Sequence, residues 1–145
     1  MSRIIKSAAT TLFLFAALAA TACEDGISGQ AFPQIQVDPG EVVLPAVPVG
    51  ERTTKFLRIW NAGGSELIIT TLDFSNALDA REFTKDHPEL PIRLQGEEEI
   101  SIPIRYAPLD EDNDEGHLII ESNDAREPTV RVRIYTLEST TDLVA

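Results

Sequence analysis

Apolar residues that recur at every second position constrain this chain most, because that period places them on one face of a β-strand. Around the Asn-Ala-Gly-Gly segment 61–64 the alternation runs through Leu57 and Ile59 and resumes at Leu67 and Ile69. The glycine pair permits the positive φ that a tight connection requires. The stretch therefore predicts a central β-hairpin, with two strands folded on residues 61–64.

The alternation slips by one position after Ile69, since the next apolar residues are Leu72 and Phe74. One extra residue in a strand has this effect, so we predict a β-bulge near Thr70-Thr71. The polar segment 75–91 has Phe83 as its one large apolar anchor. This phenylalanine is expected in the core.

Four further stretches repeat the strand pattern. Residues 35–49 form an apolar series broken by Pro45 and Pro48, which lack ladder donors and predict an edge strand that bends. The clearest inward-facing series are Ile100, Ile102, Ile104 and Tyr106; Leu118 and Ile120; and Val130, Val132 and Ile134. Seven to eight short strands at intervals of about ten residues, with no convincing amphipathic helix, predict an all-β, immunoglobulin-like β-sandwich.

The formal charge argues against a nucleic-acid partner. The chain has 145 residues and a net charge of -12, and the first 22 residues contain two cations and no acid, so removing them leaves -14. Phosphate binding requires clustered Lys and Arg, so we expect no nucleic-acid partner. A remainder of about 120 residues suffices for one core only.

The N-terminus predicts a secretory signal. Arg3 and Lys6 precede an apolar run at 11–20, which is too short to span a bilayer comfortably at roughly 20 residues. Small residues follow, up to Cys23, the only cysteine, so an intrachain disulfide is impossible. The segment Ala20-Thr21-Ala22-Cys23 resembles the lipobox of bacterial lipoproteins, and this resemblance implies acyl chains on Cys23. The alternative is ordinary signal cleavage that leaves a free thiol.

The lipobox resemblance also bears on location. Lipoproteins kept in the inner membrane of enteric-type bacteria typically carry Asp after the cysteine, whereas this chain has Glu24. The resemblance thus implies a lipid-anchored protein of the bacterial cell envelope, in the outer membrane rather than the inner. Two or three acyl chains hold a protein to a membrane almost permanently. Residues 24–32 read as a tether that reaches about 30 Å at ~3.3 Å per residue.

Ordered motifs between Val37 and Ile134 suggest a family. They include Val47-Pro48-Val49-Gly50, Asn61-Ala62-Gly63, Tyr106-Ala107-Pro108 and the run from Gly116 to Asp124. In these features the chain resembles the immunoglobulin-like domains of the abnormal-spindle and Hydin type, relatives of the major sperm protein fold that are often called choice-of-anchor D domains in bacteria. Pro45 and Thr136 stand where that pattern usually has Gly. The resemblance implies a non-catalytic scaffolding or protein-binding module.

Residues for catalysis are sparse, and we expect neither an enzyme nor a cofactor. Only His87 and His117 could titrate near neutrality, and no G-x-S-x-G turn is present. One cysteine and two distant histidines cannot supply the four ligands of structural zinc.

The acidic loop 110–116 is a weak candidate for metal binding. Its candidate ligands are Asp110, Asp112 and Asp114. An EF-hand frame fails because the glycine is one position late and strands flank the loop. A looser Ca²⁺ site remains an alternative to a solvated loop.

The stripe Phe56, Arg58 and Trp60 is the candidate partner surface. If Leu57 and Ile59 face the core, period two directs these three side chains outward, where polar residues are usual. Aromatics and Arg are enriched in protein interfaces. The alternatives are an exposed cation–π pair of Arg58 with Trp60, coverage by other strands or the C-terminal tail, or inward rotation of Trp60 by the bulge.

Together these observations predict four segments: a lipoprotein signal peptide at 1–22, the lipidated Cys23 with a tether to 33, a β-sandwich at 34–137 and a tail at 138–145. The expected function is that of a membrane-anchored, non-catalytic envelope lipoprotein of the periplasm whose sandwich binds or scaffolds a protein partner. The alternatives are a purely structural envelope protein and a calcium-dependent adhesion module that uses the loop 110–116. The sequence does not identify the partner.

Overall fold

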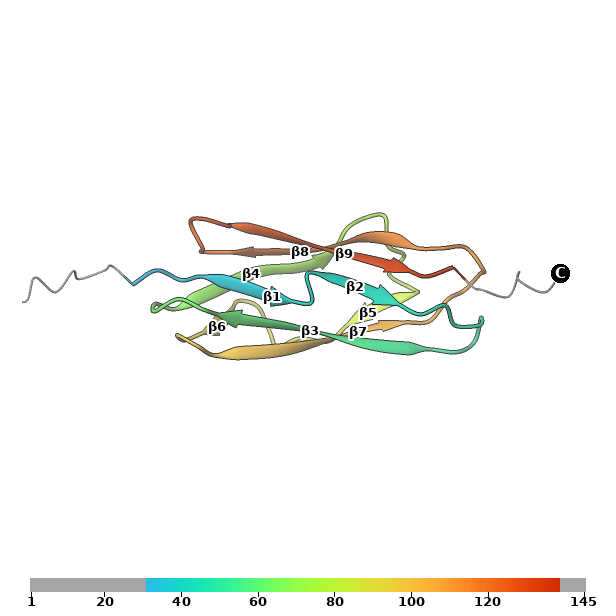
Figure 1. Cartoon of the computed structure of the whole chain (residues 1–145), viewed down its shortest axis with the longest axis horizontal. Helices are drawn as coiled ribbons and strands as arrows, with labels where there is room; N and C mark the ends of the chain where they lie inside the picture. The colour runs from blue at the N-terminus through green and yellow to red at the C-terminus, as the bar shows by residue number, and fades with distance from the viewer. Residues whose placement is uncertain (1–30, 139–145) are drawn as a thin grey trace, which may run out of the picture.

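Nine β-strands and no helix make up residues 31–138, the part of the chain that the computed structural model describes, and they form two sheets packed face to face (Figure 1). The strands are β1 (Ile35–Asp38), β2 (Glu41–Leu44), β3 (Thr53–Asn61), β4 (Leu67–Phe74), β5 (Phe83–Lys85), β6 (Ile92–Leu94), β7 (Glu99–Tyr106), β8 (Glu115–Ser122) and β9 (Thr129–Thr136). The prediction of an all-β, immunoglobulin-like sandwich is confirmed, with a higher strand count than the seven or eight expected.

The first sheet has the order β1-β3-β7-β5 and the second the order β2-β9-β8-β4-β6. Neighbouring strands are antiparallel, except that β2 runs parallel to β9. The four edge strands have only three or four residues each, whereas the five inner strands have eight or nine. Short edges offer few free backbone groups to another chain, which opposes edge-to-edge aggregation.

The prediction that residues 54–71 form a central hairpin is wrong. β3 pairs with β1 and β7, whereas β4 pairs with β6 and β8, so residues 62–66 carry the chain from one sheet to the other. Both strands direct their alternating apolar residues into the space between the sheets, which gives the same sequence pattern as a hairpin with one buried face. Backbone pairing with strands distant in sequence therefore decided the topology.

Asn61 holds this connection together. Its side chain is fully buried, and its Nδ2 donates hydrogen bonds to the carbonyl oxygens of Ser65 at 2.7 Å and Leu94 at 3.0 Å. Its Oδ1 accepts hydrogen bonds from the backbone N–H groups of Gly63 at 2.9 Å and Gln34 at 3.1 Å. One amide thus uses both its donors and both acceptor positions of its oxygen to join the N-terminal segment, the connecting loop and the end of β6.

The segment predicted as a bending edge strand is an edge in both sheets. β1 lies at the edge of the first sheet, and after Pro39-Gly40 the chain continues as β2 at the edge of the second. The prolines Pro45 and Pro48 follow β2 and lie outside any strand. This placement agrees with their missing backbone donors.

The core lies between the sheets and contains the predicted inward-facing residues. Ile102, Ile104, Leu118 and Ile120 are fully buried, and Phe83 is 1% exposed. The predicted bulge is also confirmed, because the register of β4 against β8 shifts between Ile69 and Thr71. The extra residue lets Ile69 and Leu72 both reach the core, where each is fully buried.

The two ends of the sandwich differ in what they carry. The described chain enters at one end, where the Gly64 N–H donates to the Phe32 carbonyl and the Ile35 N–H donates to the Asp124 carboxylate. It leaves after β9 at the opposite end, beside the loop that follows β2 (Figure 1). We call these the entry end and the exit end.

Candidate binding surface

The aromatic stripe Phe56, Arg58 and Trp60 lies on the outer face of the first sheet. Leu57 and Ile59 between them are fully buried, whereas Phe56 is 63% exposed. The register of β3 with β7 is continuous, and it places Pro103, Ser101 and Glu99 opposite Phe56, Arg58 and Trp60, respectively. Because the bulge lies in β4, it does not rotate Trp60 inward.

Arg58 links the stripe to the neighbouring strand. Its guanidinium carbon lies 4.3 Å from the centroid of the Trp60 ring, and its Nη1 lies 3.2 Å from Oε2 of Glu99. An exposed cation–π contact contributes about 0.5–1 kcal/mol, and a surface ion pair about 0–1 kcal/mol. Arg58 therefore covers Trp60 in part, and Trp60 is half-buried. Phe56 has no such cover from the described residues.

The outer face of the second sheet has a different character. Arg133 pairs with Glu115 at 2.9 Å and approaches Glu41 at 3.8 Å, and its guanidinium lies over Tyr135. The hydroxyl of Thr71 donates to the Glu121 carboxylate at 2.7 Å. Many polar side chains on the outer face of the second sheet therefore form ion pairs or hydrogen bonds with one another. On the outer face of the first sheet, by contrast, Phe56 is a large aromatic side chain exposed without such a partner among the described residues.

A groove of about 540 Å³ opens at the exit end, between the loop after β2 and the loop after β7. Its walls come from residues 46–49, from Tyr106, Pro108 and residues 110–113, and from residues 136–137. Sequence reasoning missed this groove, because its lining combines three segments distant in the chain. The apolar pair Val47 and Val49 beside prolines is the one local signal in the sequence, and its alternation favours an edge strand rather than a groove wall.

The acidic-loop candidates Asp110, Asp112 and Asp114 do not point to one place. Oδ2 of Asp114 accepts a hydrogen bond from the Tyr106 hydroxyl at 3.0 Å, and the Asp114 N–H donates to the Thr136 hydroxyl at 2.9 Å. Burial raises the pKa of the Asp114 carboxyl, although the Tyr106 hydrogen bond opposes this shift. Within residues 31–138, no group of three or more His, Cys, Asp or Glu side chains is arranged to hold a metal ion.

The two histidines lie apart in the fold. His87 belongs to the loop after β5, where its Nδ1 lies 2.7 Å from the carbonyl oxygen of Pro88. His117 belongs to β8, and its backbone N–H donates to the Ser75 hydroxyl. Cys23, the predicted lipidation site, lies outside the described residues. In the described part of the chain, no helix is long and apolar enough to cross a membrane.

No protein-family model and no curated protein matches the sequence. Solved structures do match the fold. The ASH / PapD-like domain 7 of human CEP192 superposes with a TM-score of 0.54 at 14% identity, over 72% of this chain and 84% of that one. The periplasmic chaperone SfaE gives 0.53 at 14% identity, over 73% of this chain and 58% of the chaperone chain.

A third match is the complex of the chaperone CsuC with the tip adhesion subunit CsuE from Acinetobacter baumannii, with a TM-score of 0.51 at 9% identity, over 73% of this chain and 57% of that one. At such identities these likenesses show the fold alone, an immunoglobulin-like sandwich that PapD-like domains also have. This chain spans somewhat more than half the length of the two chaperone-related chains. The fold class agrees with the resemblance to abnormal-spindle and Hydin-type domains.

Proposed function

We propose that this chain is a lipid-anchored, non-catalytic protein of a bacterial cell envelope whose β-sandwich binds a protein partner through the outer face of the first sheet. One observation carries the binding role: Phe56 is 63% exposed on that face, opposite Pro103 and in line with Trp60. A large aromatic side chain held on a flat sheet offers apolar area at little cost in conformational entropy.

Two further observations support a sheet face as the binding surface. The edge strands have three or four residues, so adding a partner strand to an edge would form few backbone hydrogen bonds. Arg58, the charged residue within the stripe, is already held by Glu99 and Trp60. A partner is therefore expected to contact Phe56 first and to displace or share Arg58.

The fold is compatible with this role. A similar fold occurs in the periplasmic chaperone SfaE and in a chain of the CsuC–CsuE complex, which joins a chaperone to a tip adhesion subunit. Anchoring is proposed from the sequence, through acyl chains on Cys23. The tether then joins the sandwich at the entry end, where residues 31–34 are hydrogen-bonded to the loop after β3.

The test is co-purification of the full chain from detergent-solubilised membranes, with the partner identified by mass spectrometry. The variant Phe56→Thr/Trp60→Thr is expected to keep its melting temperature within about 5 °C, because exposed substitutions to a β-compatible residue cost little. It is expected to lose the partner. A matched control is Tyr135→Thr, which removes an aromatic ring beneath an arginine on the other sheet and should retain the partner.

The outcome is read against both variants. Loss of the partner with Phe56→Thr/Trp60→Thr but not with Tyr135→Thr supports binding at the aromatic stripe. Equal retention by both variants, with normal folding, would remove the stripe from the proposal. A large loss of stability in Phe56→Thr/Trp60→Thr would show that the two aromatic side chains support the sheet.

A further inference from the structure

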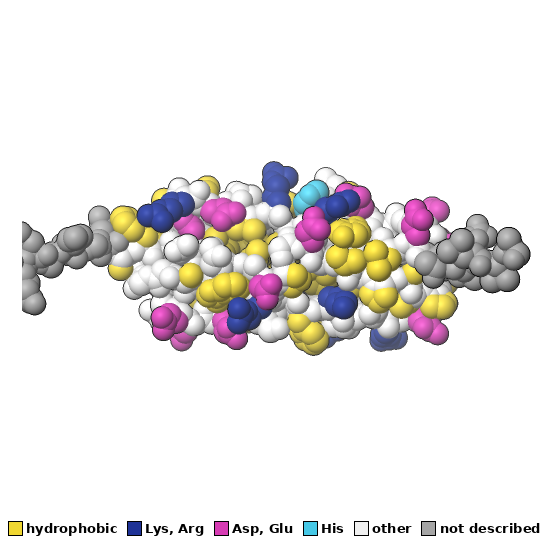
Figure 2. Space-filling model, in the orientation of Figure 1, with side chains coloured by type: hydrophobic (Ala, Val, Ile, Leu, Met, Phe, Trp, Pro, Cys, Tyr) yellow, Lys and Arg dark blue, Asp and Glu magenta, His cyan; other side chains and the backbone are white. Residues whose placement is uncertain are grey.

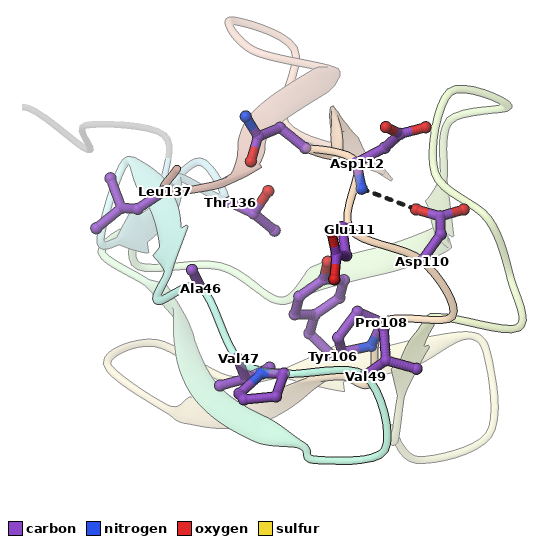
Figure 3. A pocket seen from close by; sticks show the side chains of 12 residues that line it. Ala46, Val47, Val49, Tyr106, Pro108, Asp110, Glu111, Asp112, Thr136 and Leu137 are labelled. Carbon is purple, nitrogen blue, oxygen red and sulfur yellow. Dashed lines mark hydrogen bonds between the residues drawn. The ribbon is translucent and has the colours of Figure 1, made fainter. Parts of the chain in front are cut away.

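The groove at the exit end has an apolar wall and an acidic rim (Figure 3). Its apolar lining consists of Ala46, Val47, Pro48, Val49, Pro108 and Leu137. Across from Ala46 to Val49, the loop after β7 contributes Asp110, Glu111 and Asp112. In the space-filling view, hydrophobic side chains gather over β2 and toward this end of the molecule (Figure 2).

Apolar exposure is concentrated at this end. Six large hydrophobic side chains are exposed among residues 31–138, and three of them lie at the exit end: Val49 at 53%, Leu109 at 52% and Leu137 at 50%. Val49 and Leu137 line the groove itself. Single exposed apolar residues are ordinary, but apolar side chains exposed together in a concave surface are typical of a binding site. The groove therefore offers exposed apolar surface whose burial by a ligand would be favourable.

The rim carries negative charge that no ion pair within residues 31–138 neutralises. Asp110, Glu111 and Asp112 are exposed, and none of them forms an ion pair with another residue of the segment 31–138. The lining contains no Lys or Arg. Carboxylates held this close together repel one another, so a cationic ligand would be attracted to the rim.

Hydrogen bonds hold the groove open in one shape. The Leu109 N–H donates to Oε1 of Glu82 at 2.7 Å, which fixes the start of the acidic loop, and the contact of Tyr106 with Asp114 fixes its end. On the other side, the Leu137 N–H donates to the Leu44 carbonyl at 2.9 Å. A wall fixed in this way loses little conformational freedom when a ligand binds.

We infer that this groove binds an extended segment of a partner polypeptide in which Lys or Arg side chains flank an aliphatic side chain. The aliphatic group would lie against Val47 and Val49, and the cations would reach Asp110, Glu111 and Asp112. Residues 139–145 follow directly in the chain and are an alternative occupant. They contain Asp142 and no cation, so they do not complement the acidic rim. The groove is separate from the aromatic stripe, so the inference does not depend on the proposed function.

The position of the groove adds a geometric consequence. It lies at the exit end, opposite the end where residues 31–34 join the sandwich (Figure 1). If the chain is anchored through Cys23 as proposed, the groove faces away from the lipid surface. A partner would then approach from the side opposite the membrane.

The probe is a fluorescein-labelled peptide of alternating lysine and leucine, with fluorescence anisotropy measured on the full chain purified in detergent. Two comparison peptides replace either the lysines by glutamate or the leucines by serine. The lysine–leucine peptide is expected to bind, and both comparison peptides are expected to bind at least about tenfold more weakly, since each lacks one of the two complementary features.

Two variants locate the binding. Glu111→Gln/Asp112→Asn removes two rim charges and is expected to weaken binding about tenfold, as two exposed charge pairs would. The matched control Asp86→Asn/Glu89→Gln removes two charges from the exposed loop after β5 and should leave the affinity unchanged. Val49→Ser, which shortens the apolar wall, should weaken binding without unfolding the chain.

The results distinguish binding at the groove from attraction by the net negative charge of the whole protein. If the control weakens binding as much as Glu111→Gln/Asp112→Asn, or if the lysine–serine peptide binds as well as the lysine–leucine peptide, the inference is wrong, because total charge then explains the attraction. Absence of binding by the lysine–leucine peptide also overturns it. The variant Phe56→Thr/Trp60→Thr should bind this peptide normally, which distinguishes failure of the groove from failure of the aromatic stripe.

Discussion

Replacing Asn61 by alanine should strongly destabilise the entry end of the sandwich. The change removes two donors and one oxygen from a fully buried position and leaves four backbone partners: the carbonyls of Ser65 and Leu94 and the N–H groups of Gly63 and Gln34. A buried group left without its hydrogen bond costs about 1–3 kcal/mol.

Three of the four hydrogen bonds are only partly buried, so water can replace some of what is lost, whereas the bond to Leu94 is fully buried. We therefore expect Asn61→Ala to lower the free energy of unfolding by roughly 3–5 kcal/mol, out of about 5–15 kcal/mol for a typical domain. With an m-value of about 1.5 kcal/mol per molar urea, the unfolding midpoint falls by roughly 2–3 M.

The assay is urea unfolding of the chain from residue 23 onward with Cys23→Ser, followed by Trp60 fluorescence. Asn123→Ala is the matched control, because Asn123 also bridges two backbone groups, at Ile68 and Glu66, but is exposed. Water can take over those two bonds, so the control should lose about 1 kcal/mol or less.

Asn61→Asp separates hydrogen bonding from simple loss of volume. The aspartate is nearly isosteric, but its second oxygen would face the Ser65 and Leu94 carbonyls without a proton to donate. Burial should raise its pKa in the folded state, so the loss of stability should shrink as pH falls and the carboxyl becomes protonated. If Asn61→Ala and Asn123→Ala cost the same, or if the Asn61→Asp difference does not vary with pH, the reasoning fails.

Four other outcomes are expected. Gly63→Ala should lower stability by about 1–3 kcal/mol in urea unfolding, because its Cβ would overlap the Phe32 backbone carbonyl; an unchanged midpoint would contradict this packing. Asp114→Asn should raise the melting temperature at pH 7 and lose this advantage toward pH 3.8, since the raised pKa makes the native carboxylate less favourable as pH increases; a gain that persists at low pH would exclude this cause. Cys23→Ser should move the protein from the detergent phase to the soluble fraction, and continued membrane partitioning would refute the lipid anchor. Millimolar calcium should leave the melting temperature unchanged, whereas a rise abolished by Asp112→Asn with Asp114→Asn would establish a site there.

The sequence was sufficient to assign side chains to faces. The alternation places Ile102 and Ile104 in the core and Phe56 outside, and the structure agrees for each of them. The shift of the apolar positions after Ile69 likewise predicted the bulge, because one extra residue in a strand moves the following inward-facing side chains by one position. These features are local, since the direction of a side chain depends only on its position along its own strand.

The sequence was not sufficient to assign partners to strands. A hairpin and a connection between two sheets both leave β3 and β4 with inward apolar residues on either side of residues 61–64, so the pattern could not distinguish them. The decision depended on the backbone pairing of β3 with β7 and of β4 with β8, and on Asn61, whose hydrogen bonds join segments as far apart as Gln34 and Leu94.

The two candidate binding surfaces also differ in how far the sequence predicts them. Phe56, Arg58 and Trp60 lie two residues apart on one strand, so their common face was predictable, whereas the ion pair of Arg58 with Glu99 required the pairing of β3 with β7. The groove joins residues 46–49 to residues 106–113 and 136–137. The sequence determined which side chains point outward, because that follows from the period of a strand, and only the tertiary structure brought distant outward-facing residues together, because cross-strand contacts are set by the packing of the whole chain.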